Sequence, residues 1–169
     1  MTPPKKRSAK KRAVKRSPRQ SRTKPSAGAA KPAPSPLEFR PPLGLEATIE
    51  RVVLPEHTIQ HVNPNLPPVF STPSMIGLME HATVQAVLPT LPPGFITVGT
   101  RIEVDHLKAV PDGATVRAHA KLVGYKGRFL IFDVEARSGE HVIGRGRVFR
   151  AVVDPHTHKT RAQARLQGH

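Results

Sequence analysis

The chain has 169 residues, a length that suits one folded domain with terminal extensions. It contains no cysteine, which excludes disulfide bonds and zinc sites with thiolate ligands. The formal net charge is +15, but residues 1–32 carry twelve Lys or Arg and no acidic residue, which leaves only +3 for residues 33–169. The high charge therefore belongs to an N-terminal segment and does not indicate a nucleic-acid-binding domain.

Residues 1–43 are rich in Lys, Arg, Ser, Pro and Ala and poor in apolar side chains. Such a segment buries too little apolar surface to offset the entropy of ordering it, so we predict a disordered tail. Its cations could bind polyanions without specificity, or could serve only solubility. No apolar run is long enough to span a bilayer and no signal-peptide core follows the basic start, so we expect a cytoplasmic protein.

The first elements of the domain are a strand, a loop and a helix. Apolar residues alternate over Ala47–Leu54, which predicts the strand. Prolines then make His61–Phe70 a loop. Thr72 followed by Pro73 is typical of a helix start with Thr72 as the N-cap, and the helix should end near Leu88, before the next proline.

The remainder predicts four strands with short connections, which favours an antiparallel sheet. The helix is apolar nearly all round, as expected of a buried helix. Residues 44–154 should therefore form an α+β domain, a five-stranded antiparallel sheet wrapped around one long buried helix, and residues 155–169 a short, basic, frayed tail. The four later strands are expected within Phe95–Ala109, Ala114–Tyr125, Arg128–Arg137 and His141–Val153.

Three polar residues interrupt this pattern. Glu80 lies away from the polar sector of the helix, and His106 falls on the inward, apolar phase of the strand Val98–Lys108. Thr72 places a hydroxyl at the helix N-terminus, beside unpaired backbone N–H groups. Each has a purely structural interpretation: an exposed acid, a satisfied core histidine and a helix cap. An acid and an imidazole that face one pocket would instead form an acid–base site.

The spacing of these residues resembles that of a known family. Thr72-Pro-Ser-Met-Ile-Gly-Leu-Met-Glu80 is followed by Val98-Gly-Thr100 and Val104-Asp-His106. Thr72 and Glu80 are 8 positions apart, and Glu80 and His106 are 26 apart. In these features the chain is similar to hotdog-fold acyl-CoA thioesterases, and most to the fluoroacetyl-CoA thioesterase group, over about residues 45–153.

The resemblance implies a hotdog fold, a homodimer with sites at the subunit interface, and an acyl-CoA substrate. It implies a catalytic set of Thr72, Glu80 and His106. Gly99 would offer a backbone N–H near the thioester carbonyl, and Arg150 would bind substrate. Independently of the resemblance, Arg150 is a cation on the apolar side of the last strand, where it could also extend to solvent.

Two features depart from the group. Its fluoroacetyl-specific members have aromatic residues in a lid before the helix, whereas the loop Val62–Val69 has none. The resemblance therefore does not extend to selectivity for a fluorinated substrate. Pro73 also removes one backbone N–H donor at the helix start.

We therefore expect hydrolysis of an acyl-CoA to a free acid and CoA. His106 would act as general acid–base, Glu80 would support it or activate water, and Thr72 would position the attacking group or attack itself. Two alternatives remain: a non-catalytic acyl-CoA-binding protein, and an enoyl-CoA hydratase suggested by Asn63-Pro64, although the Asp and His expected around that pair are not in place. No metal or other cofactor is implied, since the paired histidines of the chain (His57 with His61, His156 with His158) come without further ligands.

Overall fold

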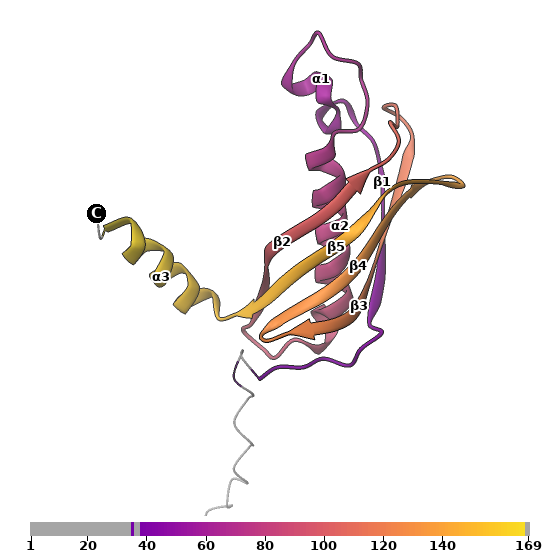
Figure 1. Cartoon of the computed structure of the whole chain (residues 1–169). Helices are drawn as coiled ribbons and strands as arrows, with labels where there is room; N and C mark the ends of the chain where they lie inside the picture. Colours follow the sequence, from indigo (N-terminus) through magenta and orange to yellow (C-terminus); the bar gives the residue numbers. More distant parts are fainter. Residues whose placement is uncertain (1–34, 36–37, 168–169) are drawn as a thin grey trace, which may run out of the picture. The chain divides into compact units, whose positions relative to one another are not determined.

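The computed structural model describes Ser35 and residues 38–167. Five strands form one antiparallel sheet in the order β1-β3-β4-β5-β2, and the long helix α2 packs along one face of it (Figure 1). The predicted disorder of the tail concerns mainly residues 1–34, 36 and 37, which lie outside the described residues. The strands are β1 (Glu46–Val52), β2 (Ile96–His106), β3 (Thr115–Lys126), β4 (Phe129–Ser138) and β5 (His141–Val153).

The helices are α1 (Ile59–Val62), α2 (Thr72–Val87) and α3 (Pro155–Gln167), with short 3-10 turns at Pro55–His57 and Leu88–Thr90. Within the described residues no helix is both long and apolar enough to cross a membrane.

The core lies between α2 and the sheet. The buried positions of β3 carry alanine and branched aliphatic side chains, so the helix can approach the strand closely. The prediction of a buried helix is confirmed, because seven residues of α2 are buried. The buried residues of these two elements include Met75, Leu78, Met79, Ala82, Ala86, Val116, Ala118, Ala120 and Leu122.

Both ends of the domain are more structured than the sequence predicted. Phe39, placed in the disordered tail, is only 9% exposed and packs in the core. Arg40 donates a hydrogen bond to the carbonyl oxygen of Gly127 (2.6 Å) and lies over the ring of Tyr125. Because Tyr125 also donates to the carbonyl oxygen of Pro41, the prediction of disorder is wrong for residues 38–43.

The prediction of a frayed C-terminal tail is also wrong, since the first thirteen residues of that segment form α3. Asp154 starts the helix: its carboxylate accepts hydrogen bonds from the backbone N–H of His156 (2.8 Å) and the hydroxyl of Thr157 (3.2 Å). The bond from His156 lowers the pKa of Asp154 below its ordinary value. Asp154 followed by Pro155 was a start signal that the basic composition of the segment concealed.

A bulge in β2 changes which residues face the helix. The register with β5 shifts between Gly99 and Arg101, so Thr100 is an extra residue. Thr97 and Gly99 therefore share the inward face with His106, and the predicted inward phase of Val98 and Thr100 is wrong. The alternation is restored before His106, whose inward direction is as predicted.

Candidate active site

Two residues with hydroxyl groups, Ser71 and Thr72, stand at the start of α2 and have different roles. Ser71, not Thr72, is the N-cap: its Oγ accepts a hydrogen bond from the backbone N–H of Ser74 (3.2 Å). Thr72 is the first helical residue, and Pro73 occupies the second position. The predicted cap is thus wrong by one residue, and the Thr72 hydroxyl is not needed to cap the helix.

Thr72 instead pairs with His106, the last residue of β2. Thr72 Oγ1 lies 2.9 Å from His106 Nδ1, and His106 Nε2 lies 3.1 Å from the carbonyl oxygen of Lys108. A carbonyl oxygen only accepts, so Nε2 carries the hydrogen of the neutral ring and Nδ1 is the acceptor. The hydroxyl of Thr72 then donates to His106, an arrangement in which an imidazole base can activate a hydroxyl group.

This pair lines an open pocket of about 340 Å³. The size is at the lower end of small-molecule sites. The remaining lining is mostly apolar and comes from the α1 region and the end of β2. It consists of Ile59, Val69, Phe70, Leu107, Lys108 and Ala109.

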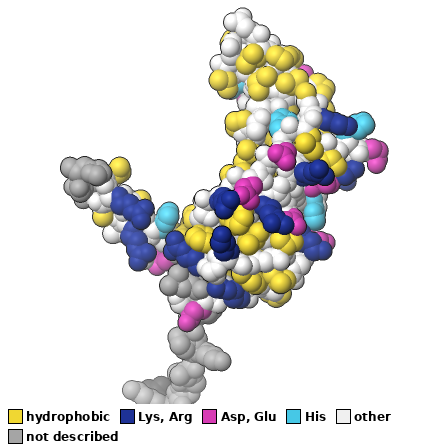
Figure 2. Space-filling model, viewed as in Figure 1, with side chains coloured by type: hydrophobic (Ala, Val, Ile, Leu, Met, Phe, Trp, Pro, Cys, Tyr) yellow, Lys and Arg dark blue, Asp and Glu magenta, His cyan; other side chains and the backbone are white. Residues whose placement is uncertain are grey.

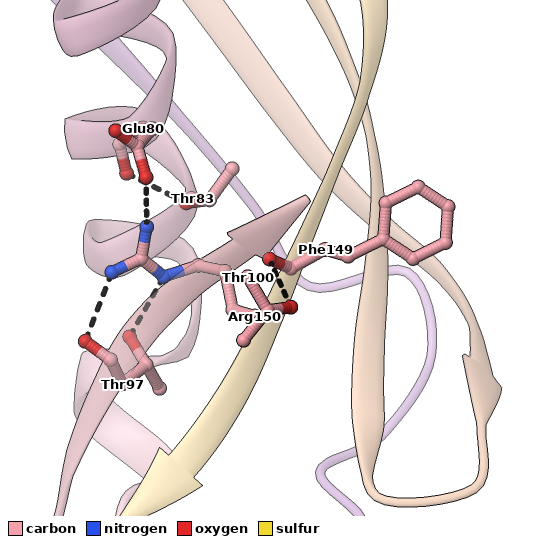
Figure 3. A network of polar contacts seen from close by, with 6 residues as sticks. All are labelled: Glu80, Thr83, Thr97, Thr100, Phe149 and Arg150. Atoms are coloured by element: carbon pink, nitrogen blue, oxygen red, sulfur yellow. Dashed lines mark hydrogen bonds and ion pairs between the residues drawn. The ribbon is translucent and has the colours of Figure 1, made fainter. Parts of the chain in front are cut away.

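The second polar cluster holds Glu80 and Arg150 (Figure 3). Arg150 Nη1 donates to Glu80 Oε1 at 3.1 Å, while Nε donates to Thr97 Oγ1 and Nη2 to the Thr97 carbonyl oxygen, both at 2.9 Å. The Arg150 side chain is 6% exposed and that of Glu80 is 32% exposed. Burial lowers the pKa of Arg150, and the Glu80 carboxylate opposes that shift, so the guanidinium remains charged at neutral pH.

Gly99 allows this carboxylate to lie against the backbone of β2. A Cβ at Gly99 would overlap Glu80 Oε1 and come within 3.8 Å of Arg150 Nη1. Any larger residue would therefore displace the Glu80 carboxylate. Because glycine has no side chain, the Glu80 carboxylate of α2 can lie close to the backbone of β2.

The predicted site residues thus fall into two groups in one chain. Thr72 and His106 are paired, whereas Glu80 lies with Gly99 and Arg150 and makes its ion pair with Arg150 rather than with His106. Eight residues along a helix correspond to about 12 Å, which separates the two groups. The expected single pocket with acid and imidazole is not formed within one chain.

The Asn-Pro loop and the histidine pairs, the other candidate features of the sequence, do not form a site in the part of the chain that the structure describes. Asn63 Oδ1 accepts a hydrogen bond from the backbone N–H of Asn65 (3.0 Å), a local turn that accounts for Asn63 in the Asn-Pro loop. Among Ser35 and residues 38–167, no group of three or more His, Asp or Glu side chains could hold a metal ion.

The two hydroxyls at the helix start should have different effects on stability. Ser71→Ala should lower the free energy of unfolding by about 1 kcal/mol because it removes the cap. Thr72→Val should change it by less than about 0.5 kcal/mol, because Thr72 is exposed and caps nothing. Urea denaturation of both variants checks this, and equal losses would contradict the assignment of the cap to Ser71.

Comparison with known proteins shows what this chain is similar to. A family model described as fluoroacetyl-CoA-specific thioesterase matches residues 53–156. Fluoroacetyl-CoA thioesterase from Streptantibioticus cattleyicolor is 40% identical over 129 residues, which cover 73% of this chain and 91% of that protein. A solved structure of the fluoroacetyl-CoA thioesterase FlK matches with a TM-score of 0.69 and 36% identity, covering 75% of this chain and 98% of the other.

A hot-dog-like protein from Thermanaerovibrio acidaminovorans shares the fold, with a TM-score of 0.69 and 23% identity over 76% of this chain and 95% of its own. The predictions of a hotdog fold and of a thioesterase enzyme are thereby confirmed. With the family match over most of the folded domain, the chain belongs to the fluoroacetyl-CoA-specific thioesterase family.

Proposed function

We propose that this protein hydrolyses the thioester of an acyl-CoA to a free acid and CoA, with Thr72, Glu80 and His106 as its catalytic set. The observation that carries the proposal is the hydrogen bond from the Thr72 hydroxyl to His106 Nδ1, because both residues line a mostly apolar pocket. A hydroxyl held by an imidazole acceptor suits acyl transfer, because the base can take the proton as the oxygen attacks.

In this mechanism His106 Nδ1 takes a proton from Thr72 or from a water that Thr72 orients. The new C–O bond forms as the C–S bond breaks, and the proton passes from His106 to the departing CoA thiolate. If Thr72 attacks, water then hydrolyses its ester by the same proton route. Glu80 supplies a fixed negative charge or activates water, and the Gly99 N–H is proposed to stabilise the carbonyl oxygen as it gains charge.

We further propose a homodimer that brings Glu80 of one copy to Thr72 and His106 of the other. Among the described strands, β2 lies at an edge of the sheet, as expected of a strand that pairs with a second chain. Ile102 points to the helix side of the sheet yet is 41% exposed, which leaves an apolar surface for a partner. A second copy would also overcome the separation of about 12 Å between the two groups.

The site is proposed to lack specificity for a fluorinated acyl group. No aromatic side chain occurs in the loop Val62–Val69, and the next residue, Phe70, is 1% exposed and belongs to the core. Figure 2 shows apolar side chains gathered near α1, where Val62 is 84% and Leu66 40% exposed. Such an exposed aliphatic surface favours contact with an acyl chain but offers nothing specific to fluorine.

The test is release of free thiol from a panel of acyl-CoA esters: acetyl, fluoroacetyl, isobutyryl, phenylacetyl and palmitoyl. We expect turnover of at least one ester, with fluoroacetyl-CoA preferred over acetyl-CoA by less than about tenfold. A preference above about a hundredfold would contradict the proposed lack of fluorine selectivity. Binding of the esters without turnover would instead support the non-catalytic alternative.

Two expectations stay predictions. A cytoplasmic location follows only from sequence features, and polyanion binding by residues 1–32 concerns a segment outside the described residues. Retention of duplex DNA affinity after deletion of residues 1–35 would contradict the assignment of that affinity to the tail.

A further inference from the structure

The family resemblance suggested Arg150 as a substrate-binding cation, but its contacts are directed into the protein. All three guanidinium nitrogen atoms already donate hydrogen bonds, one to Glu80 and two to Thr97. Its side chain is 6% exposed. A guanidinium with its three nitrogens occupied has a fixed plane and only two of its five N–H groups left.

Thr97 accounts for two of these three bonds. Its hydroxyl oxygen accepts a hydrogen bond from Nε and its carbonyl oxygen accepts one from Nη2, so Thr97 binds two of the three guanidinium nitrogen atoms. Thr97 is 9% exposed and lies on the inward face of β2, two residues before Gly99. The same strand therefore holds the arginine through Thr97 and receives the Glu80 carboxylate beside Gly99.

We infer that Thr97 is a positioning residue for the proposed reaction: it orients Arg150, and Arg150 holds the Glu80 carboxylate beside the backbone of Gly99. The inference rests on the proposed function for Glu80. Thr97 touches neither Thr72 nor His106, so it acts only through this chain of contacts. Buried polar networks of this kind fix one geometry when each donor and acceptor is used.

The test compares Thr97→Val with the wild type on the best acyl-CoA. Valine keeps the shape of threonine but cannot accept from Arg150 Nε, so the guanidinium loses one of its anchors. We expect kcat to fall by about 10- to 100-fold with KM changed less than about threefold, because misplacement of a catalytic group affects the chemical step. Thr97→Ser keeps the acceptor and should restore kcat to within about threefold of wild type.

Thr100→Val is the matched control on the same strand. The Thr100 hydroxyl donates to the carbonyl oxygen of Phe149 (3.1 Å) and lies outside the contacts that reach Glu80 (Figure 3). This variant should keep kcat within about threefold of the wild type. A similar fall in kcat for Thr100→Val would mean that any hydroxyl lost from β2 is harmful, and would overturn the inference.

A double-mutant cycle distinguishes positioning from a general structural effect. If Thr97 acts through Glu80, Thr97→Val should have almost no further effect on kcat in a Glu80→Gln background. Independent, multiplicative losses would overturn the inference, as would a loss confined to KM.

A crystal structure of Thr97→Val tests the inference without turnover. The Arg150 Nη1–Glu80 Oε1 contact should be broken or displaced in Thr97→Val and retained in Thr97→Ser; an unchanged contact in Thr97→Val would overturn the inference. If the wild type hydrolyses no ester, the proposed function fails, and the two crystal structures still decide whether Thr97 positions Glu80.

Discussion

His106→Ala is expected to lower kcat/KM for the best acyl-CoA by about 10²- to 10⁴-fold, the usual contribution of a positioned acid–base group. The variant removes the acceptor of the Thr72 hydroxyl, so neither attack by Thr72 nor attack by an oriented water has a base. The side chain is only partly buried at the end of β2, and the fold should persist. Initial rates of thiol release measure the loss, with thermal unfolding of the same samples beside them.

His119→Ala is the matched control. His119 also lies on a strand, but on the outer face of the sheet, with Nε2 3.6 Å from Glu46 Oε2. It should keep kcat/KM within about twofold of the wild type. If His106→Ala were no slower than His119→Ala, His106 would have no part in the proton transfer and the proposed mechanism would be wrong.

Mixed dimers of Glu80→Gln and His106→Ala should show activity well above the residual activity of either variant alone. If each site combines Glu80 of one copy with Thr72 and His106 of the other, a mixed dimer has one site with both residues intact and one with both changed. Co-expression with two affinity tags isolates that dimer, which should show about half of the wild-type activity. Glutamine retains an oxygen acceptor for Arg150, so the Glu80 variant should still fold.

The control for this experiment mixes His106→Ala with Thr72→Val. These two residues contact each other within one chain, so each site of their mixed dimer has one defect and no activity should return. Recovery in the control would contradict the pairing of Thr72 and His106. Absence of recovery in the first mixture, with the mixed dimer isolated, would contradict a site shared between two copies.

Local patterns were sufficient to predict the elements that carry these residues. Burial repeats along α2 and along β3, β4 and β5, so the apolar positions of the sequence identified which faces pack together. Prolines and glycines between these runs marked the connections. The same reasoning selected Glu80 and His106, because each is a polar residue on an otherwise apolar phase.

The features that the sequence did not predict depend on the conformation of a single residue or on contacts between residues far apart in the chain. One extra residue at Thr100 reverses the alternation of β2, and this concealed the inward position of Thr97. The partners Arg150 and Thr97 are 53 residues apart, and only the register of β5 with β2 brings them together. At the start of α2, both Ser71 and Thr72 are good caps, and backbone geometry rather than composition decides between them.

The packing of Phe39 into the core, with Arg40 held by Gly127 and Tyr125, defines where the enzyme can be joined to other sequences. A junction upstream of Ser35 would keep these contacts, and would also keep the hydrogen bonds that the Ser35 carbonyl oxygen accepts from the backbone N–H groups of Glu38 and Phe39. A junction at residue 44, the boundary that composition suggested, would remove an aromatic side chain from the core and a cation from its ring. The position at which the N-terminal segment can be exchanged therefore lies several residues before the boundary that the composition suggested.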